Sequence, residues 1–309
     1  DWAKTNSYPP LLWAFGVTFI ERALIDAYCR ATDISFDEAV RGGHLGIQLG
    51  HIYPELESVD PVMGLPDAPS TTVDVRHTVG YDAPLTGEID RLDDGLPVTL
   101  EENVAYYGVD KFKVKVAGEP EKDAERVQNV CRLLNSICED YAVTLDANEQ
   151  YASIEALQAL IERLRRDESI PHFDERLLFV EQPFSRKVAL SSEIGEGLKE
   201  WPNRPPVIID ESDGELGSCR RALDLGYAGT SHKNCKGVFK SIANACLIER
   251  RRREGPEQKN YILSGEDLTT IGPISLQQDL AVAGVLGLSH VERNGHHFFR
   301  GLDPFGEKI

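Results

Sequence analysis

Apolar and polar positions follow two alternating periods along most of the chain. Short runs with every second residue apolar, such as Phe112–Val116 (FKVKV), are typical of strands, and longer runs with apolar residues three and four apart are typical of helices. From about residue 71 the two patterns alternate with a period of about 30 residues, the usual length of a strand–helix unit. The predicted strands are 71–81, 111–116, 142–146, 177–181, 207–210, 229–233, 261–264 and 290–292. The predicted helices between them are 99–107, 120–138, 153–166, 191–201, 215–225, 238–253 and 274–286.

Repeated strand–helix units imply a parallel sheet, and eight strands imply that the sheet closes into a barrel. We therefore predict an α/β fold, a TIM-type (β/α)7β barrel over residues 72–301. Residues 1–71 precede the repeat and read as a partial, mainly helical N-terminal capping region, with helices within 11–40 and a Gly- and Pro-rich linker up to 71. Residues 302–309 are predicted to form a C-terminal tail.

Composition narrows the classes of partner. The 309 residues are 41% hydrophobic and carry a formal net charge of −18, which argues against nucleic acid or an anionic membrane as a partner. No run of about 18 apolar residues occurs, and the first ten residues lack the features of a signal peptide. Six scattered cysteines lack the paired spacing of zinc sites. We expect a soluble, cytoplasmic protein.

Charged residues recur where the predicted strands end. Side chains alternate between the two faces of a strand, so Lys113 and Lys115 share one face of the second strand. Asp146, Glu181 and Asp210 close three successive later strands. Active sites of barrels lie at the carboxyl ends of the strands, so these positions are candidates for chemistry.

Three carboxylates gathered at one end of a barrel predict a site for a hard cation, because a divalent ion relieves their mutual repulsion. Oxygen ligands with open positions suit Mg²⁺, and Mn²⁺ would also fit. Lys113 and Lys115 stand on one flank of this set and Lys233, in GTSHKNCKG, on the other. Lysines near a cation and near each other have a lowered pKa and can act as bases near neutral pH.

The ordered motifs KVK, LDAN, VEQP and IDES, followed by a strand-end lysine, resemble the enolase superfamily, and within it the muconate-lactonizing and dipeptide-epimerase-like branch of the mandelate racemase/muconate lactonizing enzyme family. The resemblance covers residues 72–301. It implies that Asp146, Glu181 and Asp210 bind Mg²⁺. It also implies that Lys115 and Lys233 are the two acid/base residues, with Lys113 lowering the pKa of Lys115.

The chemistry implied by this resemblance is removal of a proton α to a carboxylate, giving an enediolate stabilised by the metal. We expect a racemase or epimerase acting on a small carboxylate, in a homo-oligomer. Dehydration or cycloisomerisation by the same residues is the nearest alternative, and a barrel that binds metal and carboxylate without turnover is another. Metal-dependent hydrolysis would normally show His ligands at strand ends, and none occurs in the five motifs.

Two departures from the family pattern leave roles open. Relatives place a double glycine after the second catalytic lysine, whereas Lys233 is followed by Asn234, Cys235, Lys236 and a single Gly237, so Lys236 is a rival for the role. The seventh strand ends in SGED, with Glu266 and Asp267 and no His, which disfavours a His/Asp dyad. Relatives in this family also have an N-terminal strand meander in their lid, and we expect this sequence to open on the helical part of that lid, without the meander.

The remaining candidates are polar residues next to these motifs, and each also has a structural interpretation. Asp146 alone would suit a turn, and Asp210 alone a helix cap. Asn148 and Gln182 are expected to support the metal ligands. Glu211 is expected to support the metal ligands or to cap a helix, and Glu266 and Asp267 are expected to contribute to substrate selectivity.

Two further polar positions lie at the end of the repeat. Glu292 is expected to contact substrate or to pair with Arg293 or Lys233. His296 and His297 are adjacent and so point apart, without further ligand spacing, and we expect them at the surface or at the rim of the substrate site.

Overall fold

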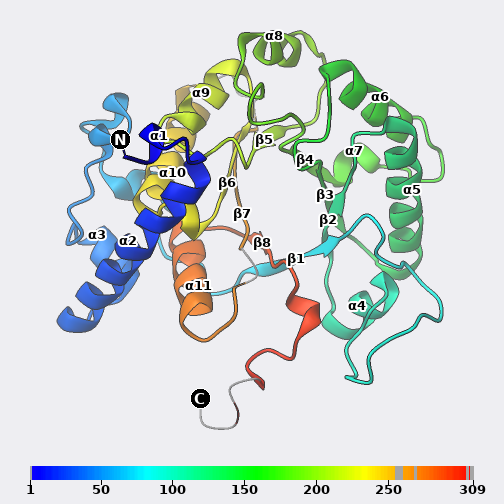
Figure 1. Ribbon diagram of the computed structural model, residues 1–309, viewed down its shortest axis with the longest axis horizontal. Helices are drawn as coiled ribbons and strands as arrows, with labels where there is room; N and C mark the ends of the chain where they lie inside the picture. The colour runs from blue at the N-terminus through cyan, green and yellow to red at the C-terminus, as the bar shows by residue number, and fades with distance from the viewer. Residues whose placement is uncertain (1, 255–259, 268–269, 304–305, 307–309) are drawn as a thin grey trace. The chain divides into compact units, whose positions relative to one another are not determined.

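Eight parallel strands form the framework of the protein (Figure 1). The computed structural model describes residues 2–254, 260–267, 270–303 and 306. The strands are β1 (Asp74–Val79), β2 (Lys111–Lys115), β3 (Ala142–Asp146), β4 (Leu177–Glu181), β5 (Val207–Ile209), β6 (Gly229–His232), β7 (Ile262–Gly265) and β8 (His290–Glu292). Their order in the sheet is β7-β6-β5-β4-β3-β2-β1-β8, and each pair with a described register is parallel. The predicted TIM-type barrel is confirmed. Of the predicted tail, residues 304, 305 and 307–309 lie outside the described part.

The chain divides into two compact units. Unit 1 comprises Asp1–Val73 and Ile208–Val291, and unit 2 comprises Asp74–Val207 and Glu292–Ile309. The helices of unit 1 are α1 (Trp2–Thr5), α2 (Pro10–Thr32), α3 (Phe36–Arg41), α9 (Ser218–Leu225), α10 (Val238–Glu254) and α11 (Ile274–Leu286). Those of unit 2 are α4 (Leu100–Tyr107), α5 (Pro120–Ile137), α6 (Ile154–Arg165), α7 (Phe173–Arg176) and α8 (Ser192–Glu200).

Local sequence signals set the helix ends of unit 2. Thr99 and Glu102 form a reciprocal capping box at the start of α4, and Gly108 ends this helix with a φ of 64°, which a residue without Cβ adopts at no steric cost. The side chain of Ser153 caps α6 by accepting from the backbone N–H of Ala156. Helices α5 and α6 lie side by side along the outer face of β2 and β3 (Figure 1). Their buried apolar faces, with the outward residues of the strands, form the core of this unit.

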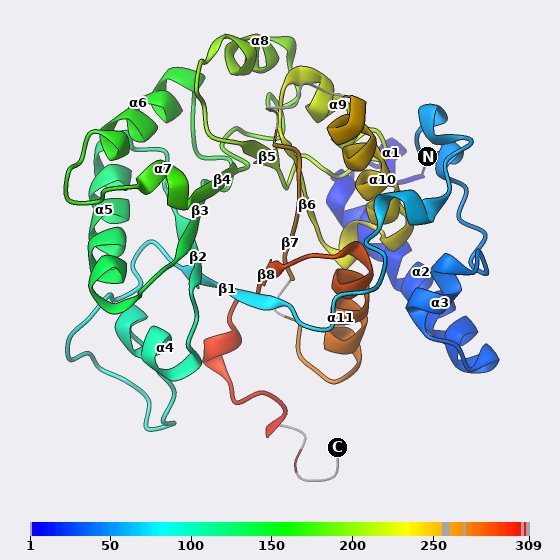
Figure 2. The same cartoon turned by 180° about the vertical axis from the view of Figure 1, so that it is seen from behind.

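Unit 1 packs helices on helices around α10. Figure 2 shows α2 and α3 beside α10 and α11, and this region shares one buried apolar cluster. The predicted linker is more ordered than its composition indicates, because it contains three 3₁₀ turns, η1 (Leu49–His51), η2 (Pro54–Leu56) and η3 (Pro61–Gly64). Tyr53 is fully buried and donates a hydrogen bond to Asn244 at 2.5 Å. The backbone of Gly64 packs closely against Cys246, because a Cβ added at Gly64 would lie only 2.5 Å from the Cα of Cys246.

The observed elements follow the predicted ones closely from β1 onward. The largest differences in the repeat are at β1, which covers residues 74–79 rather than 71–81, and at α9, which begins at Ser218 rather than at residue 215. The short helices α1 and α7 were not predicted, because four residues carry too little periodicity to be recognised. Among the described helices, none combines the length and the apolar character needed to cross a bilayer.

A buried carboxylate fixes the connection between β2 and α5. The Asp123 side chain accepts hydrogen bonds from the backbone N–H groups of Ala117, Gly118 and Glu119, at 2.7, 2.9 and 3.0 Å. Its fourth donor is the hydroxyl of Tyr151, at 2.7 Å. This loop directly follows the strand that carries both candidate lysines, so Asp123 stabilises the end of that strand.

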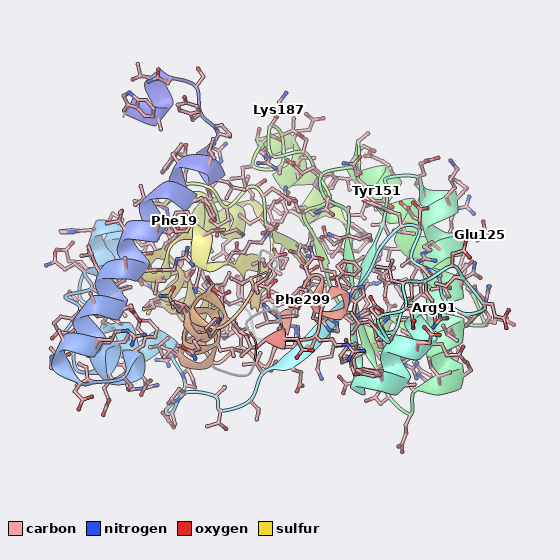
Figure 3. All side chains as sticks on the ribbon, turned by 60° about the horizontal axis from the view of Figure 1, so that its bottom comes forward. Phe19, Arg91, Glu125, Tyr151, Lys187 and Phe299 are labelled. Carbon is pink, nitrogen blue, oxygen red and sulfur yellow. The ribbon has the colours of Figure 1, made fainter. Side chains whose placement is uncertain are left out.

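We expect Asp123→Asn to lower the free energy of unfolding by about 1–3 kcal/mol, because an amide has one acceptor oxygen where the carboxylate has two and leaves buried donors unsatisfied. Denaturant titration followed by circular dichroism measures the loss. Glu125→Gln is the matched control, since Glu125 is exposed on the same helix (Figure 3) and should change stability by less than about 0.5 kcal/mol. Equal losses for the two variants would contradict the assignment.

Candidate active site

Lys113 is the buried centre of the candidate site in unit 2. Its side chain is 1% exposed, and its Nζ lies 2.9 Å from Asp146, 3.1 Å from Glu181 and 2.7 Å from Glu292. The predicted parity holds, because Lys113, Asp146 and Glu181 share one face of the sheet. A buried ammonium is tolerated only when anions and hydrogen bonds replace its lost hydration, and three carboxylates do so here.

Lys115 is the second amine on the same face, two residues nearer the strand end. It pairs in register with Asp146, and its Nζ lies 2.5 Å from Asp146 Oδ2 and 2.7 Å from Asn148 Oδ1. Unlike the buried lysine, its side chain retains 16% exposure. Asn148 also donates its backbone N–H to Asp146 at 3.0 Å, so it contacts both partners, and its predicted role in supporting a metal ligand stays a prediction.

The carboxylate of Glu292 has two hydrogen-bond donors that the sequence did not suggest. It accepts from Lys113 at 2.7 Å and from the hydroxyl of Thr78 at 2.5 Å. The register explains this contact, because Thr78 lies directly beside Lys113 on the inward face. The predicted contact of Glu292 with substrate, or its pairing with Arg293 or Lys233, stays a prediction. Gln182 is fully buried, and its amide donates to the carbonyl of Phe184 at 2.7 Å, which holds the residues after β4.

Unit 1 repeats the arrangement of lysine and carboxylate. Asp210, directly after β5, lies 2.9 Å from Lys233 Nζ and 2.6 Å from Lys236 Nζ. Lys233 also lies 2.7 Å from Glu266, which accepts a hydrogen bond from Ser231 at 3.1 Å. Thus Glu266, at the end of β7, belongs to the charged cluster of unit 1.

The two rival lysines of unit 1 differ in accessibility. Lys236 has a side chain 1% exposed and donates to the carbonyl of Ser231 at 2.6 Å, whereas the side chain of Lys233 is 13% exposed. Burial lowers the pKa of Lys236, but the carboxylates led by Asp210 outweigh it, so the pKa stays above its ordinary value. Lys236 is therefore held as a cation by its carboxylate neighbours.

Two acidic candidates of unit 1 have less defined surroundings. Glu211 is half-buried beside Asp210, and Asp267 is 7% exposed after Glu266. Their predicted roles in support and in substrate selection stay predictions.

The carboxylates offer ligands of one chemical kind. Asp146 and Glu181 in unit 2, and Asp210 and Glu266 in unit 1, are all buried and all carry oxygen donors. Such a set fits Mg²⁺ or Mn²⁺ better than a softer metal. Glu266 was predicted to contact substrate, and its place beside Lys233 makes it an additional candidate for the metal.

His296 and His297 were predicted to lie at the surface or at the rim of the substrate site, and the second alternative stays a prediction. Both are half-buried, and their rings contact the buried His77 of β1, with ring centroids 5.1 and 4.8 Å from it. No local signal along the chain indicated this cluster, because 219 residues separate His77 from His296.

Comparison with known proteins identifies the fold. No protein-family model matches the chain, and no curated protein matches it by sequence. Among solved structures, a mandelate racemase/muconate lactonizing protein from Herpetosiphon aurantiacus is 16% identical, with a TM-score of 0.55, over 88% of this chain and 62% of its own. A mutant of methylaspartate ammonia lyase from Clostridium tetanomorphum is 15% identical, with a TM-score of 0.57, over 90% and 62%. The fold is that of these enzymes.

A third solved structure, 2-chloromuconate cycloisomerase from Rhodococcus opacus 1CP, is 18% identical with a TM-score of 0.51, over 75% of this chain and 55% of its own. The chain therefore spans 55–62% of the length of these three structures. At such identities the likeness shows the fold. This fold agrees with the barrel fold that the resemblance of the ordered motifs implied, and the reaction depends on the site itself.

The buried His232, next to Lys233, should make the stability of the protein depend on pH. Burial, and secondly Lys236, lower its pKa to about 3, and its ring hydrogen bonds to Ser241 at 2.6 Å. In the unfolded chain the imidazole has a pKa of about 6.5. Between about pH 6.5 and pH 3 the unfolded state therefore binds a proton that the folded state does not, so the free energy of unfolding falls as the pH falls. We expect wild type to lose about 1.4 kcal/mol per pH unit more than His232→Gln between about pH 6 and 4. Denaturant midpoints at each pH measure this, and parallel curves would contradict it.

Proposed function

We propose that this protein is a Mg²⁺-dependent enzyme of the enolase superfamily that removes a proton α to a substrate carboxylate, as a racemase or epimerase. The observation that carries the proposal is a repeated pairing. In each unit a partly exposed lysine contacts an aspartate at a strand end, Lys115 with Asp146 and Lys233 with Asp210. Two such amines allow a proton to be removed from one face of a substrate carbon and returned to the other.

The acidic residues supply the metal site in this proposal. The carboxyl ends of strands in a parallel barrel meet at one edge, so Asp146, Glu181 and Asp210 are assigned to one ion, with Glu266 as a further candidate. A bound Mg²⁺ would offset the negative charge that develops on the substrate carboxylate. The buried carboxylates of each unit already surround a positive charge, that of a lysine ammonium, so their environment suits a cation.

The lysines carry the proton transfers. For one enantiomer the neutral amine of one lysine takes the α-proton onto its Nζ, while the electron pair of the broken C–H bond passes into the carboxylate. The ammonium of the other lysine then donates its proton to the opposite face. Lys113 positions Asp146 and adds positive charge beside Lys115. We assign the second acid/base role to Lys233 rather than Lys236, because Lys236 is enclosed and donates to a backbone carbonyl.

Elimination by the same residues is the second candidate. The structures of similar fold include an ammonia lyase and a cycloisomerase, and either chemistry needs one lysine as the base. Loss of a β-substituent during α-proton exchange distinguishes elimination from racemisation.

We expect substitution of the two lysines to separate the faces of the reaction. With mandelate and methylaspartate as a first panel of chiral acids, Lys115→Met and Lys233→Met should each abolish racemisation. Each should retain α-proton exchange with D₂O for only one enantiomer, followed by NMR. General acid–base catalysis contributes typically about 10²–10⁴-fold, which is the expected loss on the affected face.

Lys187→Met is the control for these variants, because Lys187 is an exposed lysine after β4 (Figure 3) and should leave exchange unchanged. If both enantiomers of an active acid exchanged equally in Lys115→Met, the assignment of this residue would be wrong.

The metal assignment makes a separate prediction. Chelation should stop exchange and added Mg²⁺ should restore it, whereas Glu181→Gln should need a higher Mg²⁺ concentration because one anionic ligand is lost. Calorimetric titration of Mg²⁺ into the chelated protein measures the affinity. Unchanged Mg²⁺ affinity in Glu181→Gln would exclude this carboxylate as a ligand.

A further inference from the structure

A second group of metal-ligating side chains lies in unit 2, on the other face of the sheet from Lys113. The register of β1 and β2 pairs Thr78 with Lys113 and His77 with Phe112. Because neighbouring positions of a strand point to opposite faces, His77 faces away from the charged cluster. Its ring meets Phe112 edge-on, with the centroids 6.4 Å apart.

Three imidazoles converge at this place. His77 comes from β1, and His296 and His297 come from the turn η5 (His296–Phe298) that follows β8. One ring nitrogen from each lies within 4.8 Å of the others, and His77 Nδ1 is 2.9 Å from His296 Nε2. A tetrahedral zinc ion, with bonds of about 2.0–2.1 Å, places its ligand nitrogens about 3.3 Å apart. The one pair with a stated distance is closer than this, at 2.9 Å, and no pair is more than 4.8 Å apart, so rotations of the three rings would bring the nitrogens to the spacing of a zinc site.

The hydrogen bonding of the cluster is incomplete in a way that suits a metal. The Nδ1 atom of His297 is buried, and no described residue forms a hydrogen bond with it. A buried polar atom without a partner is costly and calls for an explanation, such as an ion that uses its lone pair. The edge of the Tyr107 ring covers His296, with the centroids 4.9 Å apart, which limits solvent access from α4.

The charge state of the rings is compatible with ligation. Burial lowers the pKa of His77 to about 3 and that of His296 to about 4, and it also lowers the pKa of His297. The rings are therefore neutral at about pH 7, the form in which imidazole binds metals. The charged group that acts on the cluster is Arg293, which further lowers the pKa of His296.

We propose that His77, His296 and His297 bind one divalent metal ion of the zinc class, separate from the carboxylate site, and that this ion attaches the segment after β8 to β1. Imidazole nitrogens select Zn²⁺ and similar borderline metals, whereas Mg²⁺ prefers oxygen, so the two sites differ in selectivity. Three protein ligands leave a fourth position open for water. The ligands come from β1 and from the turn η5 after β8, so the ion would cross-link these two segments of unit 2.

To test this, Zn²⁺ is titrated into the chelator-treated protein in excess Mg²⁺, and binding is followed by calorimetry. The zinc that remains bound after dialysis is then measured by atomic emission. Wild type should bind one Zn²⁺ through this site and gain thermal stability, because an ion that binds only the folded state stabilises it. His77→Phe keeps an aromatic ring against Phe112, and His297→Asn changes a half-buried residue and tests the same site if the first variant folds poorly. Each should weaken zinc binding by more than about 100-fold.

His172→Asn is the matched control, because His172 is an exposed histidine of unit 2 with a φ of 62°, a conformation that Asn tolerates. It should bind zinc as wild type does. Glu181→Gln tests separation from the carboxylates and should also leave zinc binding unchanged. The proposal is overturned if wild type binds no zinc in stoichiometric amount, or if His297→Asn binds it as tightly as wild type. Loss of binding in Glu181→Gln alone would place zinc at the acidic residues and equally overturn it.

Discussion

The buried ammonium of Lys113 is the interaction on which the arrangement of unit 2 depends. Its Nζ contacts carboxylates at the ends of three other strands, Asp146 of β3, Glu181 of β4 and Glu292 of β8. Each of these acids would repel the others if the cation were absent, and the cation could not be buried without them. The charges are therefore mutually required, and they hold the carboxyl ends of the strands at fixed positions where substrate chemistry is proposed.

The architecture was predictable from the sequence because it depends on periodicity. Alternation along FKVKV predicts that Lys113 and Lys115 share one face of their strand, and the observed register agrees. Elements without a period were not predictable. The turns η1 to η3 lie in a stretch rich in Gly and Pro, and their order comes from contacts with α10, such as that of Tyr53 with Asn244.

The candidate site was predictable in its residue types and less so in its pairings. A strand-end position indicates which edge of the sheet a side chain reaches, but not its partner among several nearby charges. Glu292 illustrates this limit, since its donors Thr78 and Lys113 are 214 and 179 positions away in the sequence. The contact of His77 with His296 and His297 is of the same kind. The parity of β1 places His77 on the outer face, and only the fold brings the later turn to it.

The two units share one arrangement, in which a strand-end aspartate contacts one buried lysine and one partly exposed lysine. Asp146 contacts both Lys113 and Lys115, and Asp210 contacts both Lys236 and Lys233. Lys113 and Lys236 are enclosed, each with a side chain that is 1% exposed, whereas the side chains of Lys115 and Lys233 are 16% and 13% exposed. The enclosed ammonium therefore compensates the buried charge of the aspartate, and the second amine of each pair is the one open to solvent.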